Sequence, residues 1–158
     1  MEKRYYIAYG SNLNVRQMRM RCPGATICGT ANLDGWGLLF KGSKTGSYLT
    51  IEEREGATVP VVIWEVTEDD ERELDRYEGY PAFYYKRDFS LEYKGIRTGK
   101  RRTVAAFAYI MREERPIGVP SGFYLDTCFE GYDTFCFDRD ILLAAYDKSL
   151  EACGYERG

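Results

Sequence analysis

The run Thr58-Val-Pro-Val-Val-Ile-Trp-Glu-Val66 is the most strand-like segment of the chain, because it is rich in valine and isoleucine. Branched and aromatic side chains favour the pleated, half-buried surface of a sheet. Pro60 lacks an N–H group for a neighbouring strand, so its position indicates that the run begins at a sheet edge or at a strand start. The segment therefore predicts a β-rich core.

Segments on both sides of this run extend the predicted sheet. Glycines 29, 35 and 37 interrupt one of these segments and suggest bends or bulges, as in a curved or barrel-like sheet. The turn between the last two strands is basic. Strands are predicted at 3–9, 25–41, 47–53, 83–93 and 101–111, with a turn at 42–46.

Helical signals separate the strands. Thr67 and Asp138 are typical N-cap residues, and Gly79 followed by Pro81 ends the helix that begins after Thr67. Helices are predicted at 14–22, from 67 to about 77, at 121–130 and at 138–153. The predicted fold class is α+β: a curved, mainly antiparallel sheet flanked by a few α-helices.

Length and composition indicate one domain spanning residues 1–158. A net charge of −3 gives no general attraction to nucleic acid or to an anionic membrane. The basic cluster between Lys94 and Arg102 raises the alternative of RNA binding, but no basic track extends it, and a solvated hairpin tip is favoured. Only five apolar residues follow the N-terminal charges, and no segment approaches membrane-spanning length, so we expect a cytoplasmic protein.

The chain has no histidine and five cysteines, none with C-x-x-C spacing. The cysteines are interpreted as small buried hydrophobic residues in a reducing compartment. The acidic clusters lack the alternation of a calcium-binding loop, and we expect neither a metal nor a cofactor. Without an imidazole, proton transfer must use a carboxylate, Tyr, Lys or Cys.

Two segments carry candidate chemistry. The loop Tyr9-Gly10-Ser11-Asn12-Leu13 joins an apolar strand to a helix, and its hydroxyl, amide and backbone N–H groups suit an anion, although such a loop is also a common turn. Glu78 lies at a predicted helix C-terminus, between Tyr77 and Tyr80, where the dipole and the aromatic rings favour a raised carboxyl pKa. A solvated glutamate at a helix end is the alternative.

Three blocks together resemble the gamma-glutamylcyclotransferase family. They are Tyr9-Gly-Ser-Asn-Leu13, Leu74-Asp-x-x-Glu-Gly79 and Pro120-Ser-x-x-Tyr124, in the family's order and at its approximate intervals. Sister branches carry Leu after Tyr-Gly-Ser or Tyr-Gly-Thr, so Asn12 favours the gamma-glutamylcyclotransferase branch itself. The resemblance implies a small mixed β-barrel with surrounding helices.

The resemblance also implies site residues. Its general acid/base falls on Glu78, and its substrate-binding residues fall on Tyr9, Gly10, Ser11, Asn12, Leu13, Tyr84, Tyr109 and Tyr124. The expected reaction converts a gamma-glutamyl compound to 5-oxoproline and a free amine, without a cofactor. The leaving group is expected to lie near residues 42–48 and 80–84, with Tyr48, Tyr80 and Phe83.

Two alternatives stay open from the sequence. One is a cyclotransferase for a gamma-glutamylamine or an antibiotic intermediate, and the other is a non-catalytic binding protein of the same fold. The expected partner is a small gamma-glutamyl molecule, with neither nucleic acid nor a membrane as partner. The resemblance is also compatible with a homodimer.

Overall fold

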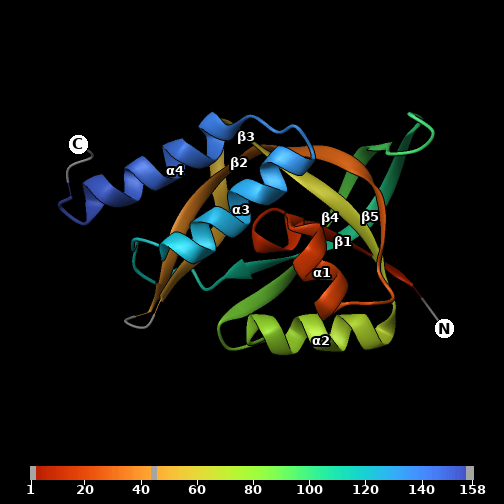
Figure 1. The fold of residues 1–158 in the computed structure, drawn as a ribbon, viewed down its shortest axis with the longest axis horizontal. Helices are drawn as coiled ribbons and strands as arrows, with labels where there is room; N and C mark the ends of the chain where they lie inside the picture. Colours follow the sequence, from red (N-terminus) through yellow and green to blue (C-terminus); the bar gives the residue numbers. More distant parts are fainter. Residues whose placement is uncertain (1–2, 44–45, 156–158) are drawn as a thin grey trace.

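The computed structural model describes residues 3–43 and 46–155. In these residues the strands form a closed barrel in the order β1-β3-β2-β4-β5 (Figure 1). Neighbouring strands are antiparallel except β1 and β5, which run parallel. The predicted mixed, mainly antiparallel barrel is therefore confirmed. The strands are β1 (Arg4–Ala8), β2 (Thr26–Ser43), β3 (Gly46–Val66), β4 (Tyr84–Gly95) and β5 (Arg101–Met111).

The two longest strands pair along nearly their whole length, and this pairing corrects the prediction of separate strands at 47–53 and 58–66. Residues 54–57 continue β3 as a bulge opposite Gly35. Gly35 and Gly56 have φ values of +83° and +80°, a region that glycine enters without steric cost, so both strands bend there without separating.

Other details of this pair also differ from expectation. The register shifts near Gly29, as predicted, but Gly37 pairs regularly with Glu52. Pro60 lies inside β3 rather than at its start; β1 pairs only with residues 62–66, so Pro60 has a strand partner on one side only. Residues 44 and 45 of the predicted turn lie outside the described residues.

Each of the four α-helices in the described residues begins at a side-chain cap. Thr67 and Asp70 form a capping box, in which Asp70 N–H donates to Thr67 Oγ1 at 3.1 Å and Thr67 N–H donates to the Asp70 carboxylate at 3.2 Å. The helix predicted to end near residue 130 continues to Thr134. The helices are the 3₁₀ turn η1 (Ser11–Leu13), α1 (Val15–Arg21), α2 (Glu68–Glu78), α3 (Gly122–Thr134) and α4 (Arg139–Ala152).

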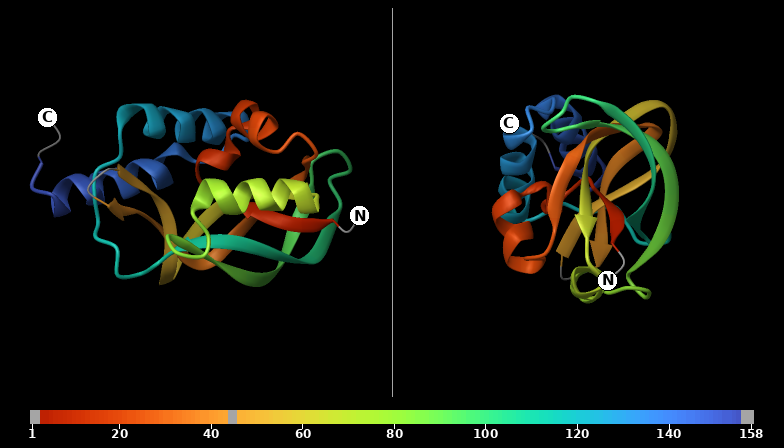
Figure 2. Two further views of the ribbon diagram at one scale, coloured as in Figure 1. Left: turned by 90° about the horizontal axis from the view of Figure 1, so that it is seen from below. Right: turned by 90° about the vertical axis from the view of Figure 1, so that its right-hand side faces the viewer.

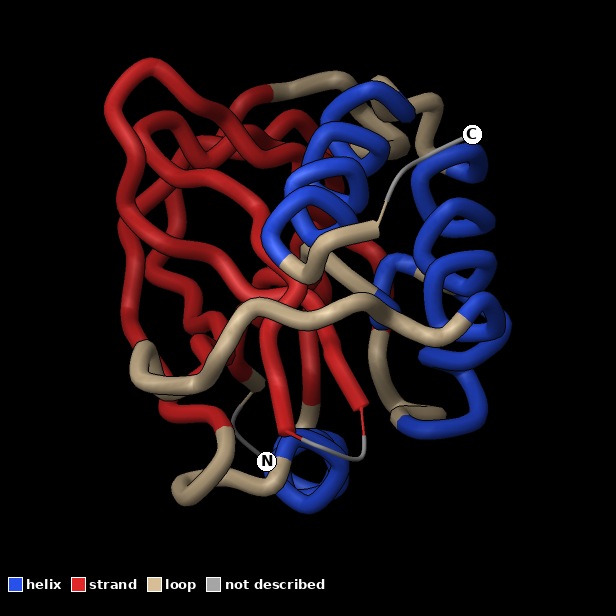
Figure 3. The backbone as a smooth tube through the Cα atoms, turned by 90° about the vertical axis from the view of Figure 1, so that its left-hand side faces the viewer, coloured by secondary structure: helices blue, strands red, loops and turns tan. Residues whose placement is uncertain are grey.

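The helices cover one side and one end of the barrel. Helices α3 and α4 lie along the same side (Figures 2 and 3), and α2 runs beside β1, where Arg4 donates to Glu71 at 2.8 Å (Figure 2, left). The fully buried core includes Phe40, Ile51, Ile63 and Phe107. No helix of the described residues has the length and apolar character needed to span a membrane.

The cysteines are more exposed than predicted. All five are free thiols; Cys22 and Cys128 are buried, Cys28 is partly buried, and Cys136 and Cys153 are exposed. The exposed pair lies at the ends of α3 and α4, where no core packs against them. The interpretation as buried hydrophobic residues is therefore correct only for the first two.

Gly131 of α3 fixes the distance between this helix and η1. A Cβ atom at Gly131 would lie 2.6 Å from Leu13 Cβ and 2.8 Å from the Leu13 backbone carbon, which cannot yield as a flexible side chain would. We expect Gly131→Ala to lower the free energy of unfolding by about 1–3 kcal/mol, measured by urea denaturation.

Gly122 provides the matched control, because it lies in the same helix and a Cβ there meets no atom within 4 Å. Gly122→Ala should leave stability unchanged or raise it slightly, because alanine is the better helix former. Equal effects of the two substitutions would contradict close packing of α3 on η1.

Candidate functional site

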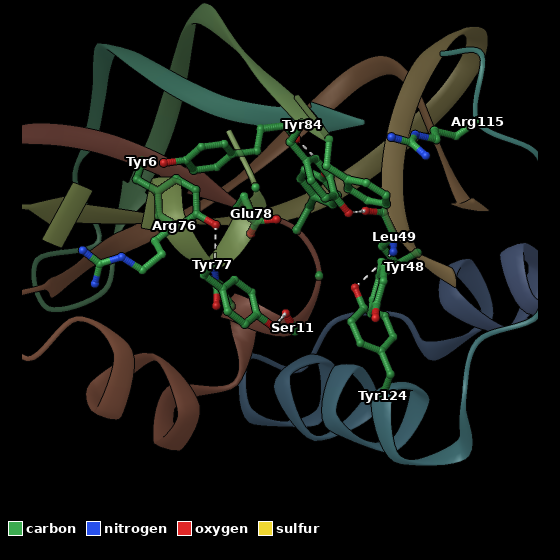
Figure 4. Close-up of a pocket in the computed structure, with 16 residues that line it drawn as sticks. Tyr6, Ser11, Tyr48, Leu49, Arg76, Tyr77, Glu78, Tyr84, Arg115 and Tyr124 are labelled. Carbon is green, nitrogen blue, oxygen red and sulfur yellow. Dashed lines mark hydrogen bonds between the residues drawn. The ribbon is translucent and has the colours of Figure 1, made fainter. Parts of the chain in front are cut away.

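A cavity of about 620 Å³ opens at the end of the barrel where β1 ends and β4 begins. Its walls come from strands β1, β3, β4 and β5, from η1, α2 and α3, and from the loops beside them (Figure 4). A volume of this size suits a small molecule. The lining residues are Tyr6, Tyr9, Gly10, Ser11, Asn12, Tyr48, Leu49, Arg76, Tyr77, Glu78, Gly79, Phe83, Tyr84, Tyr109, Arg115 and Tyr124.

The structure brings together all but one of the residues predicted to form the site. Leu13 is the exception: it is fully buried and packs against α3 instead of lining the cavity. Of the aromatic residues expected near a leaving group, Tyr48 and Phe83 line the cavity and Tyr80 does not. The cavity residues otherwise include Glu78, residues 9–12 and the tyrosines at 84, 109 and 124.

Glu78 is the last residue of α2, and Gly79 in the left-handed region (φ +64°) ends the helix directly after it. The partly buried carboxyl group faces the cavity, near the centre of Figure 4. No side chain or backbone group of the described residues donates a hydrogen bond to it. Burial raises the pKa of Glu78 from 4.5 to about 8, an effect that the positive charge of Arg21 partly offsets.

Two tyrosines hold the backbone of Leu49 at the cavity wall. The Tyr84 hydroxyl donates to the Leu49 carbonyl at 2.8 Å, and the Leu49 N–H donates to the Tyr124 hydroxyl at 3.0 Å. Burial raises the pKa of both hydroxyls well above the usual value, so they stay neutral. These contacts fix the start of β3 against β4 and α3.

A second pair of tyrosines joins β1, β5 and α2. The Tyr9 hydroxyl donates to the Tyr109 carbonyl at 2.6 Å. The Tyr109 hydroxyl in turn donates to Asp75 Oδ1 at 2.6 Å, one turn before Glu78. The two tyrosines predicted as substrate-binding residues therefore also fasten the helix that carries the acid.

The polar side chains of the predicted binding loop form hydrogen bonds to neighbouring protein groups. Asn12 is buried; its Nδ2 donates to the Tyr6 hydroxyl at 2.8 Å and its Oδ1 accepts from Arg21. Ser11 Oγ shares a hydrogen bond of 3.2 Å with the Tyr77 hydroxyl. Gly10 has a φ of −127°, so it does not use the left-handed region that its residue type permits.

Sequence reasoning did not assign several residues that lie in or near the cavity. Arg21 lies with its guanidinium 3.5 Å from the centre of the Tyr77 ring, beside Glu78, although it belongs to a different helix. Tyr6 and Arg115 also line the cavity. Only Tyr77 carried a local signal, because it precedes Glu78; the others reach the site through long-range contacts.

The cavity thus offers one acid with a raised pKa, surrounded by tyrosines whose hydroxyls are mostly committed to the protein itself. Such an acid suits proton transfer at neutral pH. In residues 3–43 and 46–155, no three Cys, Asp or Glu side chains gather as metal ligands would.

Comparison with known proteins places this chain in a family. Residues 6–126 match the family described as "Gamma-glutamyl cyclotransferase, AIG2-like". The chain belongs to this family. The matched range contains the predicted binding loop, Glu78 and Tyr124.

Curated relatives include gamma-glutamylcyclotransferases of Mus musculus and Bos taurus. The mouse protein is 30% identical over 119 residues, which cover 70% of this chain and 62% of the relative. The bovine protein is 34% identical over 87 residues, covering 51% of this chain and 46% of the relative. The matches thus span roughly half to three fifths of the curated relatives' length.

Solved structures share the fold. A structure described as "Gamma-glutamyl cyclotransferase" superposes with a TM-score of 0.71 at 24% identity, covering 94% of this chain and 86% of that one. YkqA from Bacillus subtilis superposes with a TM-score of 0.70 at 17% identity, over 94% of this chain and 55% of that one. At these identities the likeness shows the barrel architecture.

The raised pKa of Glu78 predicts a pH-dependent stability difference. The folded protein holds this proton more tightly than the unfolded chain, so the free energy of unfolding falls as pH rises from about 4.5 to about 8. The glutamine of the Glu78→Gln variant cannot ionise, so the free energy of unfolding of this variant does not fall in the same way. Between pH 5 and pH 9, urea denaturation should show Glu78→Gln gaining roughly 2–4 kcal/mol relative to the wild type.

Glu68→Gln is the control, because Glu68 is an exposed residue in the first turn of the same helix. Its stability difference from the wild type should change little over the same pH range. A constant difference for Glu78→Gln would show that the Glu78 carboxyl titrates at its ordinary pKa, contrary to the burial argument.

Proposed function

We propose that the protein is a gamma-glutamylcyclotransferase, in which Glu78 moves the protons of an intramolecular aminolysis. The observation that carries the proposal is the partly buried, unpartnered carboxyl group of Glu78 facing the cavity of a chain from this family. The products are 5-oxoproline and a free amine.

The substrate supplies its own nucleophile. The α-amine of a gamma-glutamyl compound attacks its own γ-carbonyl carbon; the new N–C bond closes a five-membered ring, and the bond to the leaving nitrogen breaks. Holding the two groups in line can be equivalent to an effective molarity of about 10⁵–10⁸ M. The protein therefore needs no nucleophilic side chain.

Proton transfer is the task left to the protein. The α-ammonium must lose a proton before it attacks, and the leaving nitrogen must gain one before it departs. The Glu78 carboxylate accepts the first proton and, as the acid, donates it to the leaving nitrogen. A pKa of about 8 makes both steps accessible near neutral pH.

Polar groups of residues 10–12 complete the proposed site. In η1 the first helical hydrogen bond is donated by Leu13 N–H to the Gly10 carbonyl, so the amides of Ser11 and Asn12 precede it and have no partner within the turn. With the Ser11 hydroxyl, they hold either the α-carboxylate or the developing oxyanion. A donor to an oxyanion contributes about 2.7–4 kcal/mol in comparable sites.

A non-catalytic binding protein of the same fold is the alternative from another class. The geometry of Glu78 favours the enzyme. A buried acid without a partner lowers the stability of the protein, and it does not raise the affinity for a neutral amide. The Glu78 carboxyl group has a task when a substrate brings an ammonium group, because that ammonium must give up a proton before the amine can attack.

We expect Glu78→Gln to lower kcat for 5-oxoproline formation by about 10²–10⁴-fold, since a positioned acid/base contributes that much. The measurement is chromatographic quantification of 5-oxoproline from gamma-glutamylalanine. The Michaelis constant should change far less than kcat, because Gln keeps the shape of the side chain.

Glu68→Gln should retain wild-type activity and so control for loss of a charge from α2. Undiminished turnover by Glu78→Gln would remove Glu78 from the mechanism. Binding of gamma-glutamyl compounds by the wild type without any 5-oxoproline would support the non-catalytic alternative instead.

A further inference from the structure

Arg115 is a charged residue of the cavity that the proposed proton transfer does not use. It lies in the loop between β5 and α3, partly buried, with its guanidinium 4.6 Å from the centre of the Phe83 ring. In the part of the chain that the structure describes, no carboxylate forms an ion pair with it.

The other cavity arginine is already neutralised. Arg76 donates to Glu73 at 2.8 Å, and Figure 4 shows its guanidinium directed away from Glu78. Among the cavity residues that the structure describes, Arg115 is therefore the cation without a carboxylate partner. A guanidinium in such a place attracts an anionic group of a ligand.

The loop that carries Arg115 is fixed to the barrel on both sides of this residue. Arg115 N–H donates to the Arg112 carbonyl at 3.1 Å, and the next residue, Pro116, accepts from Gly42 N–H at 3.0 Å. Gly118 N–H donates to the Phe40 carbonyl at 3.1 Å. These bonds to β2 fix the backbone from which the Arg115 side chain extends, and the guanidinium itself lies against the Phe83 ring. A loop backbone that is already ordered reduces the entropy lost on binding.

Arg115 and Glu78 lie in different parts of the cavity. In Figure 4 the Glu78 carboxyl is near Ser11 and Tyr77, whereas Arg115 lies beyond Tyr84 and Leu49 and points back toward them. If the α-amine of the substrate meets Glu78, as proposed above, the leaving group extends toward Arg115. A carboxylate on the carbon next to the leaving nitrogen would face the guanidinium.

Aromatic rings line the space beside Arg115. The ring centre of Tyr48 lies 6.3 Å from that of Phe83 and 5.2 Å from that of Tyr124, both in edge-to-face geometry. All three rings line the cavity. They form an apolar wall against which an apolar or aromatic side chain packs favourably.

We propose that Arg115 binds the carboxylate of a leaving amino acid, so that the preferred substrates are gamma-glutamyl amino acids with apolar or aromatic side chains. The inference rests on the proposed function and assigns the leaving-group end of the same site. Gamma-glutamylamines lack the carboxylate, and those that end in an ammonium group meet the positive charge of Arg115.

Two substrates that differ only in this carboxylate test the assignment: gamma-glutamylphenylalanine and gamma-glutamylphenethylamine. We expect the wild type to favour the first by about 10- to 100-fold in kcat/KM, the usual worth of a charge-assisted bidentate contact. Arg115→Gln should abolish this preference by lowering kcat/KM for gamma-glutamylphenylalanine alone. Unchanged turnover of gamma-glutamylphenethylamine by Arg115→Gln also shows that this variant is folded.

Arg97→Gln removes the same charge from the exposed turn between β4 and β5 and should keep the wild-type preference. Gamma-glutamylaspartate should be a poorer substrate than gamma-glutamylphenylalanine by tenfold or more, because its second carboxylate would lie against the aromatic wall. The reverse order would overturn the apolar part of the assignment.

These measurements distinguish a failure of the role assigned to Arg115 from a failure of the proposed cyclotransferase reaction. Equal wild-type kcat/KM for the matched substrates, or an equal loss for both in Arg115→Gln, would overturn the role of Arg115 and leave the cyclotransferase reaction standing. No 5-oxoproline from either substrate would overturn the proposed function, and this inference with it.

Discussion

Closure of the barrel between β1 and β5 is the constraint on which the site depends. This parallel contact pairs Tyr5 with Ala106 and Tyr6 with Phe107. It brings the end of β1 to β5, where the Tyr9 hydroxyl reaches the Tyr109 carbonyl across 100 positions of sequence. The loop at residues 10–12 follows β1 directly, so its place beside the cavity is set by this closure.

The same contact region fixes the acid. Lys86 of β4 binds Glu71 at 2.6 Å and Asp75 at 2.7 Å, and Asp75 also accepts from Tyr109. These charged contacts are partly shielded from solvent and hold α2 against the barrel wall. Glu78, at the end of that helix, has no such partner. The backbone that carries its carboxyl group is therefore held firmly, while the carboxyl group itself has neither an ion-pair nor a hydrogen-bond partner among the described residues.

Local signals were sufficient for much of the fold. The cap at Thr67 begins α2, and the glycine at 79 ends it at Glu78, which is why the sequence could place the acid at a helix terminus. Strand β5 was predicted with its observed bounds because it is flanked by turn residues and rich in branched and aromatic side chains. The family resemblance supplied half of the residues that line the cavity.

Long-range packing decides the parts that sequence reasoning could not reach. Leu13 belongs to the motif but turns into the core, because α3 approaches η1 closely at Gly131. The side chain of Asn12, read as a marker of one family branch, is bonded to Tyr6 and Arg21. Arg21 and Arg115 have no distinguishing neighbours in sequence; only the folded barrel brings them near Glu78 and Phe83.

In the proposed reaction, the substrate itself removes the need for a histidine. With a pKa of about 8, the Glu78 carboxyl is mostly protonated at neutral pH when the cavity holds no cation. An ammonium group bound beside it lowers that pKa, because an opposite charge stabilises the carboxylate. In the proposed reaction the substrate thus creates the base that deprotonates it. The cost of burying an acid without a partner is then offset when a gamma-glutamyl ammonium group, and not a neutral molecule, fills the site.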